Sequence, residues 1–107
     1  SAVATDSNSV VLKDTLPVGI EMDVSGTPVT YTNGTAACGV TVTTGIATST
    51  TDSVDYSSDG TTWAYTPNVG AVYDPSVKAF QVRFGGALAA SAGQTTPCTV
   101  KFRARIK

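Results

Sequence analysis

The acidic and hydroxyl side chains of residues 55–60 come nearest, by type and spacing, to a metal site. The run Asp-x-Ser-x-Asp-Gly matches the first half of a calcium-binding loop, and its candidate oxygen ligands are Asp55, Ser57 and Asp59. The acid expected at the twelfth position of such a loop is Thr66 here. The commoner interpretation is a hairpin turn whose Asp side chains bond their own backbone. We predict no metal and no cofactor, and keep these residues as the calcium candidate.

Three aromatic side chains close to that run are candidates for a sugar-binding platform: Tyr56, Trp63 and Tyr65. Alternation along a strand puts Trp63 and Tyr65 on one face and Ala64 on the other, so at least one set belongs to the core. Catalysis has little support, because the chain contains no His to activate a Ser or Cys and no paired Glu. We predict that the protein is not an enzyme.

The last ten residues, Cys98–Lys107, alternate with the period of a half-buried β-strand. One face is expected to complete the core: Cys98, Val100, Phe102, Ala104 and Ile106. The other face is basic: Lys101, Arg103, Arg105 and Lys107. These like charges need solvent or acids, and an acid-rich segment lies in the opposite half of the chain, at Asp14, Glu21 and Asp23. Either the face is solvated and discourages edge aggregation, or it contacts the acidic segment of another copy.

The two cysteines, Cys38 and Cys98, are predicted to form a structural disulfide. Metal or redox chemistry would more often use a CxxC pair or a neighbouring His, and the chain has neither. Closing a loop of about sixty residues contributes about 4 kcal/mol by the chain-entropy estimate. Such a bond implies an oxidising compartment. The alternative is that both cysteines are reduced and buried as small apolar side chains.

Length and composition indicate one domain spanning residues 1–107, of the all-β class. Only 14% of the 107 residues are charged, and Thr, Ser, Val, Ala and Gly outnumber the good helix formers. A net charge of −1 offers no general attraction for nucleic acid or anionic membranes, and it lets copies approach one another. No signal peptide and no apolar stretch of about twenty residues is present, which predicts a mature, exported chain without direct membrane insertion.

Alternation and turn signals predict about seven or eight short strands at roughly ten-residue spacing. The clearest runs are Ile20–Val24, Gly39–Thr44, Val54–Ser57, Thr61–Thr66, Lys78–Phe84 and Cys98–Lys107. Residues 1–9 form an N-terminal arm or a weak strand. Asn33 begins a glycosylation acceptor sequence, although a plain Asn-Gly turn explains it more simply. The whole pattern is typical of an immunoglobulin-like antiparallel sandwich, with a small closed barrel as the alternative.

Several segments together resemble the conserved-repeat domain of prokaryotic surface proteins, catalogued as the domain of unknown function eleven. The segments are Val10–Ile20, Val54–Trp63, Tyr73–Phe84, and Gly86–Gly93 leading into Val100–Ile106. The resemblance covers nearly the whole chain. It implies an immunoglobulin-like sandwich in secreted, envelope or fibre proteins of bacteria and archaea, with no catalytic residues to carry over.

One departure from that family concerns the first strand, which its members usually carry before the segment corresponding to residues 1–9. A sandwich lacking this strand would have an incomplete sheet and should recruit a strand from a partner. Alternatively, residues 1–11 fill the place, or the chain is trimmed. We expect a non-enzymatic extracellular subunit of a pilus-like or surface-layer filament that adds strands between copies or docks on a separate helical pilin core. The alternative is a monomeric cell-surface adhesion or carbohydrate-binding module.

Overall fold

The computed structural model describes residues 10–87 and 97–107, and within these ranges the regular structure is almost entirely β. Ten short strands are present in these ranges: β1 (Val11–Thr15), β2 (Ile20–Asp23), β3 (Val29–Thr32), β4 (Val40–Thr41), β5 (Val54–Ser57), β6 (Tyr73–Asp74), β7 (Ala79–Arg83), β8 (Gly85–Gly86), β9 (Thr99–Phe102) and β10 (Ala104–Ile106). One turn of 3-10 helix, η1 (Val69–Ala71), precedes β6. The predicted N-terminal arm, residues 1–9, lies outside the described residues.

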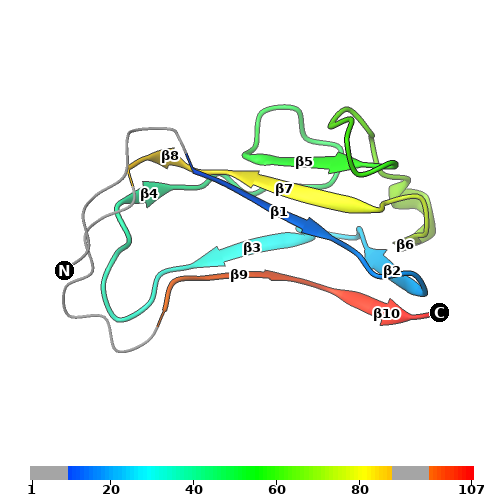
Figure 1. Cartoon of the computed structure of the whole chain (residues 1–107), viewed down its shortest axis with the longest axis horizontal. Coiled ribbons are helices and arrows are strands. Elements are labelled where there is room, and N and C mark those ends of the chain that lie inside the picture. The colour runs from blue at the N-terminus through cyan, green and yellow to red at the C-terminus, as the bar shows by residue number, and fades with distance from the viewer. Residues whose placement is uncertain (1–9, 88–96) are drawn as a thin grey trace.

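The strands form four small antiparallel sheets, which lie in two facing layers (Figure 1). Each layer is called a sheet below. In the first sheet, β7 lies between β1 and β5, and β8 continues β7 beyond Phe84 to pair with β4. In the second, β2 lies between β10 and β6, while β3 pairs with β9. Since one residue separates β9 from β10, these two are halves of one terminal strand that runs antiparallel to β2 and β3.

The interruption of the terminal strand at Arg103 coincides with the break between β2 and β3. The segment that joins β2 to β3 contains Gly26 at φ +59°, a left-handed conformation that glycine adopts without strain. The Arg103 guanidinium spans this break by donating to the carbonyl oxygens of Ser25 and Thr27. A single basic side chain therefore satisfies backbone acceptors that the ladder leaves free.

The core lies between the sheets and consists mostly of inward-facing side chains at alternate strand positions. Its largest fully buried members are Phe80, Met22, Val24, Val29, Val77 and Val82. Burying an aliphatic or aromatic side chain of this size stabilises the fold by about 1.5–3 kcal/mol. On one side of the molecule, some inward-facing apolar side chains remain exposed.

The fold class is the predicted antiparallel all-β sandwich with one disulfide. Joining the halves of the interrupted strands leaves eight runs, in agreement with the prediction. The second strand of the predicted hairpin, Thr61–Thr66, is reduced to one bridge between Tyr56 and Tyr65. Within the described ranges, the sheets do not close into the alternative small barrel, because β1 and the terminal strand each pair on one side only.

Candidate functional site

Two strand edges lie unpaired on the same side of the sandwich, among the residues that the structure describes. Leu16 N donates to Lys78 O, and Phe84 N donates to Val10 O, so the even-numbered residues of β1 bond to β7. Both backbone groups of a residue in an antiparallel strand point the same way. Val11, Lys13 and Thr15 therefore direct their N–H and C=O groups away from the sheet.

The terminal strand also has one unpaired edge, along β10. Asp23 N donates to Arg103 O, and Lys107 N donates to Gly19 O, which assigns the odd-numbered residues of β10 to the ladder with β2. Ala104 and Ile106 consequently present their backbone groups at the outer edge. An edge of this kind is a template for another strand.

The inward-facing side chains next to these edges are not covered. Leu12 is 41% exposed, Phe102 36% and Ile106 84%, although Phe102 stacks on buried Phe80 with ring centroids 4.9 Å apart. The prediction that the apolar face of the terminal strand completes the core is therefore wrong for its last residues. The period-two alternation is present, but Ile106 at the end of the strand remains exposed.

An apolar groove of about 400 Å³ opens between the sheets toward the end of the molecule that holds β4 and β8. Its lining combines residues from both sheets, among them Val10, Leu12, Val40, Phe84, Val100 and Cys98. None of the described residues that line it is charged. This groove and the two free edges together constitute what we call the open side.

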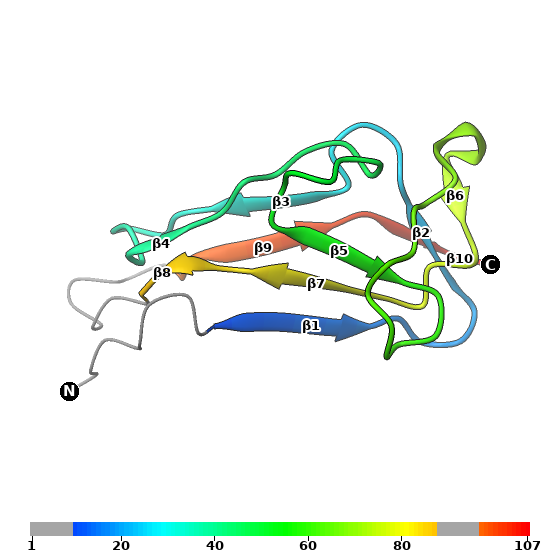
Figure 2. The same ribbon diagram turned by 90° about the horizontal axis from the view of Figure 1, so that it is seen from above.

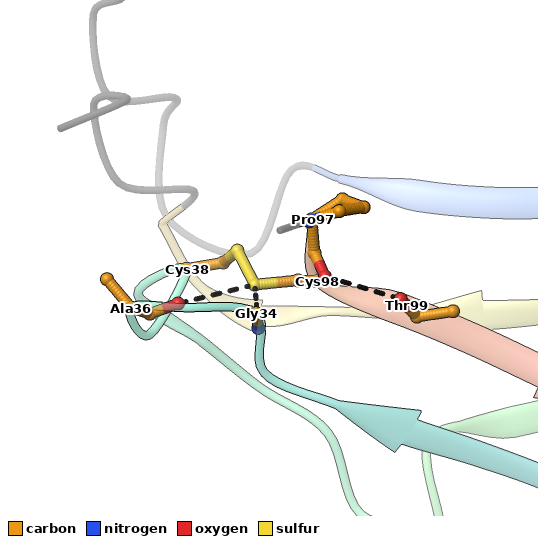
Figure 3. Close-up of a disulfide and its surroundings, with 6 residues drawn as sticks. All are labelled: Gly34, Ala36, Cys38, Pro97, Cys98 and Thr99. Atoms are coloured by element: carbon orange, nitrogen blue, oxygen red, sulfur yellow. Dashed lines mark hydrogen bonds between the residues drawn. A yellow bond between two sulfur atoms is a disulfide. The ribbon is translucent and has the colours of Figure 1, made fainter. Parts of the chain in front are cut away.

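The predicted disulfide joins Cys38 to Cys98 at the end of this groove (Figure 3). The Cα atoms are 6.5 Å apart, and the backbone N–H of Gly34 donates to Cys98 Sγ at 3.3 Å. The bond ties the loop before β4 to the start of β9, so it links the two sheets where few strands meet. It confirms the predicted pairing and excludes the alternative of two reduced cysteines.

The basic face of the terminal strand meets acids from its own chain. Arg103 Nε lies 3.1 Å from Asp23 Oδ2, and Arg105 Nε lies 3.1 Å from Glu21 Oε1. The Arg105 guanidinium also sits 3.9 Å from the ring centroid of Tyr73, a cation–π contact. These pairs explain how like charges coexist on one strand.

The other residues of the predicted interface, Asp14, Lys101 and Lys107, do not take part in these two ion pairs. Asp14 lies on β1, in the other sheet, and the structure gives Lys101 and Lys107 no ion pair with a described residue. A contact between copies through this face stays a prediction. Asn33, at the start of the acceptor sequence, is exposed after β3, and its modification also stays a prediction.

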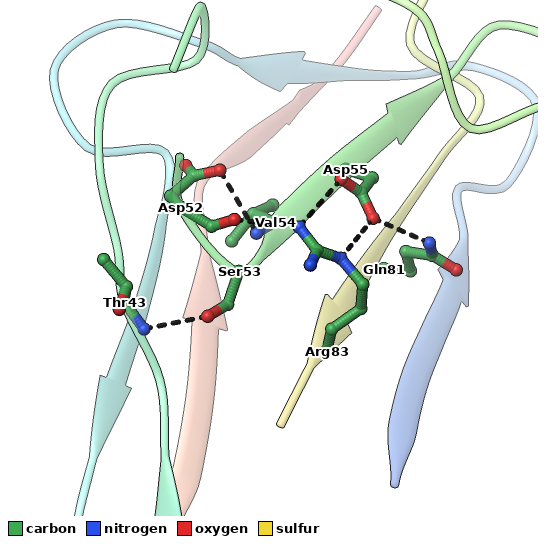
Figure 4. A network of polar contacts seen from close by, with 7 residues as sticks. All are labelled: Thr43, Asp52, Ser53, Val54, Asp55, Gln81 and Arg83. Carbon is green, nitrogen blue, oxygen red and sulfur yellow. Dashed lines mark hydrogen bonds and ion pairs between the residues drawn. The ribbon is translucent and has the colours of Figure 1, made fainter. Parts of the chain in front are cut away.

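The calcium candidate residues are occupied by other contacts. Asp55 accepts from Arg83 Nε at 2.7 Å and from Gln81 Nε2 at 2.8 Å (Figure 4). Asp59 accepts from the N–H groups of Thr61 and Thr62, which together with the Ser57 hydroxyl hold its pKa well below the ordinary value. No group of three metal-ligating side chains occurs among the described residues. The hairpin-turn interpretation is the one that the hydrogen bonds support.

The three aromatic candidates do not form one exposed platform. Tyr56 is 4% exposed, and the Tyr65 hydroxyl donates to Asp74 Oδ2 at 2.7 Å. Trp63 is half-buried, with Lys13 Nζ 5.7 Å from its ring centroid. Tyr56 belongs to the core, and Tyr65 packs against that core as a partly buried side chain.

Two buried carboxylates escaped the sequence reading. Asp74 accepts from the backbone N–H groups of Asn68 and Ser76 as well as from the Tyr65 hydroxyl. The Asp74-Pro75 pair, a common turn signal, could have identified it. Asp52 is 6% exposed; its Oδ1 accepts from Val54 N, while its Oδ2 has no protein partner. Burial raises the pKa of Asp52 above the ordinary value.

No family model, no curated protein and no solved structure matches this chain. Its class therefore comes from the structure alone: an antiparallel all-β sandwich, closed by one disulfide and open along one side. None of the helical structure in residues 10–87 and 97–107 is long and apolar enough to cross a membrane.

Proposed function

We propose that this chain is a non-enzymatic, extracellular structural subunit of a pilus-like or surface-layer filament, and that copies associate by β-strand addition. The observation that carries the proposal is the open side, where unpaired backbone edges flank inward-facing apolar residues. The resemblance to the conserved-repeat domain of prokaryotic surface proteins belongs to the same proposal. A disulfide between the sheets suits an exported subunit, because such bonds persist in oxidising compartments.

Association would cover apolar side chains that are exposed in the isolated chain. Leu12, Phe102 and Ile106 lie on inward faces but remain in contact with water, and covering apolar surface is worth about 25 cal/mol per Å². An added strand would also satisfy edge N–H and C=O groups in the order that a sheet requires. A net charge of −1 opposes the approach of copies only weakly.

Electron microscopy of the purified native protein tests the proposal, with light scattering to give the mass in solution. We expect uniform filaments or open-ended oligomers whose subunits retain the disulfide. A protein that stays monomeric at high concentration would contradict self-assembly, and filaments formed only with a second, helical chain would assign the subunit to a separate pilin core. Dispersed particles that bind glycans would favour the adhesion module instead.

A further inference from the structure

We infer that residues 1–9 of a second copy form the strand that completes the sandwich, lying along the outer edge of β9 and β10. This inference rests on the proposed filament and names the contact that holds it together. Four features carry it: the vacant place in the second sheet, the edge beside it, the side chains that face it and the composition of residues 1–9.

Among residues 10–87 and 97–107, no strand lies beside the terminal strand opposite β1, and this is the vacant place. Figure 2 shows β1 along one margin of the molecule, with β9 further from that margin, so the first sheet extends beyond the second. Leu12 projects from β1 toward the second sheet and is 41% exposed for this reason. A strand added next to β9 and β10 would lie beneath Leu12 and fill the groove from the open side.

The edge of β10 is suited to accept it. Ala104 and Ile106 direct both backbone groups outward, whereas Arg103 and Arg105 use theirs within the sheet and their side chains on Asp23 and Glu21. The arginines are therefore already neutralised, which leaves Lys101 and Lys107 as the cations next to an incoming strand. An extended segment with small side chains toward the groove and a negative charge on its outer face would match this edge.

Residues 1–9 have that composition. In an extended strand, Val3 would face the groove with the small side chains of Ser1, Thr5 and Ser7, whereas Ala2, Ala4 and Asp6 would face outward, on the side of the lysines. At about 3.3 Å per residue, nine extended residues span about 30 Å, enough to follow the terminal strand from Thr99 to Ile106. The segment precedes β1, so a copy that donates it keeps every described strand in its own core.

Crosslinking between two singly substituted full-length chains tests the donor and the acceptor together. A Val3→Cys chain is mixed with a Leu12→Cys chain under mild oxidation, and the bonds formed are mapped by mass spectrometry. We expect an interchain disulfide at about tenfold the yield of the control Lys13→Cys, because docking raises the effective concentration. Lys13 is the matched control, since it neighbours Leu12 but lies over Trp63 on the opposite face of β1.

Proline substitution separates the two edges. Ala104→Pro removes an N–H group that the sheet does not use, and Lys13→Pro does the same on β1. We expect Ala104→Pro to abolish filaments while near-ultraviolet circular dichroism stays native, and Lys13→Pro to leave them intact. The reverse pattern would overturn the assignment of the edge.

The outcomes also separate this inference from the proposed function. Filaments without the Val3–Leu12 crosslink would overturn the donor strand and leave the filament proposal standing. A crosslink confined within one chain, seen in a dilute Val3→Cys, Leu12→Cys double variant, would show that the segment fills its own groove and would overturn donation between copies. Absence of any self-assembly by the native protein would overturn both.

Discussion

At the scale of single residues, the carboxylates of Asp59 and Asp74 hold turns by accepting several hydrogen bonds each. Asp74 is 3% exposed and gathers three donors: the Tyr65 hydroxyl and two backbone N–H groups. The aspartates of the calcium candidate likewise accept hydrogen bonds from neighbouring side chains and backbone. Short polar side chains in this protein thus compensate for its short strands, because they satisfy backbone donors that no ladder reaches.

We predict that Asp74→Ala lowers the free energy of unfolding by about 3 kcal/mol, because it leaves buried donors without an acceptor. Tyr65→Phe removes only one of the three hydrogen bonds and should cost about 1 kcal/mol. Urea denaturation at neutral pH measures both. Equal losses in the two variants would contradict the role given to Asp74 as the shared acceptor.

Asp23 should make the fold acid-sensitive. The Ser25 hydroxyl and N–H, followed by Arg103, lower the pKa of this carboxyl to about 2. A folded-state pKa below the unfolded value means that its stabilising effect is complete above about pH 4 and is lost as the pH falls toward 2. Asp23→Asn should therefore flatten the pH dependence of the melting temperature in that window. An unchanged slope would show that another carboxylate is responsible.

At the scale of elements, the two faces of the terminal strand make different contacts. Its basic face sets the register against β2, since Arg105 is the ladder partner of Glu21. Its apolar face is anchored at Cys98 and Phe102 and then becomes uncovered toward Ile106.

Charge reversal along this strand should separate folding from assembly. Arg103→Glu with Arg105→Glu breaks both ion pairs and places new carboxylates against Asp23 and Glu21, whose side chains are only 14% and 10% exposed. We expect it to lower the free energy of unfolding by about 3 kcal/mol, because a largely buried charge loses its partner. Lys101→Glu with Lys107→Glu should leave the unfolding free energy nearly unchanged. Only the lysine variant tests the contact with other copies, and we expect it to slow filament growth, as followed by light scattering. Growth at the native rate would remove these lysines from the interface.

At the scale of the whole molecule, two sheets meet around a modest core that one covalent bond reinforces. The disulfide links segments 60 residues apart, at the end where β4 and β8 contribute only two residues each. That end also holds the groove. The disulfide therefore holds the two sheets together at the end of the molecule where the groove leaves the core uncovered.

Replacing both cysteines by Ser should lower the free energy of unfolding by about 4 kcal/mol, the chain-entropy value for this loop. Thermal unfolding under oxidising conditions measures the loss, and the native protein with reductant serves as the comparison. A loss below about 1 kcal/mol would show that the sheets are held mainly by their core.

Local pattern carried the prediction of fold class. Period-two alternation located β2, β5, β7 and the terminal strand within a residue or two, because alternation reports which faces of a strand are buried. The cysteine count and the absence of His were enough to predict the disulfide. The hairpin turn at Asp59 was readable for the same reason, since its hydrogen bonds are local.

Other properties depend on contacts between distant segments, and only the tertiary structure decided them. The pairing of Arg103 with Asp23 and of Arg105 with Glu21 needed the register of β10 on β2, which no local signal contains. The role of Asp74 required three segments to converge. Above all, alternation states that Phe102 and Ile106 face inward, but whether anything covers them depends on which segments lie opposite them. The sequence by itself determined strands, turns and the covalent link, and the arrangement of the sheets decided that one side stays open, because coverage is a property of the facing layer.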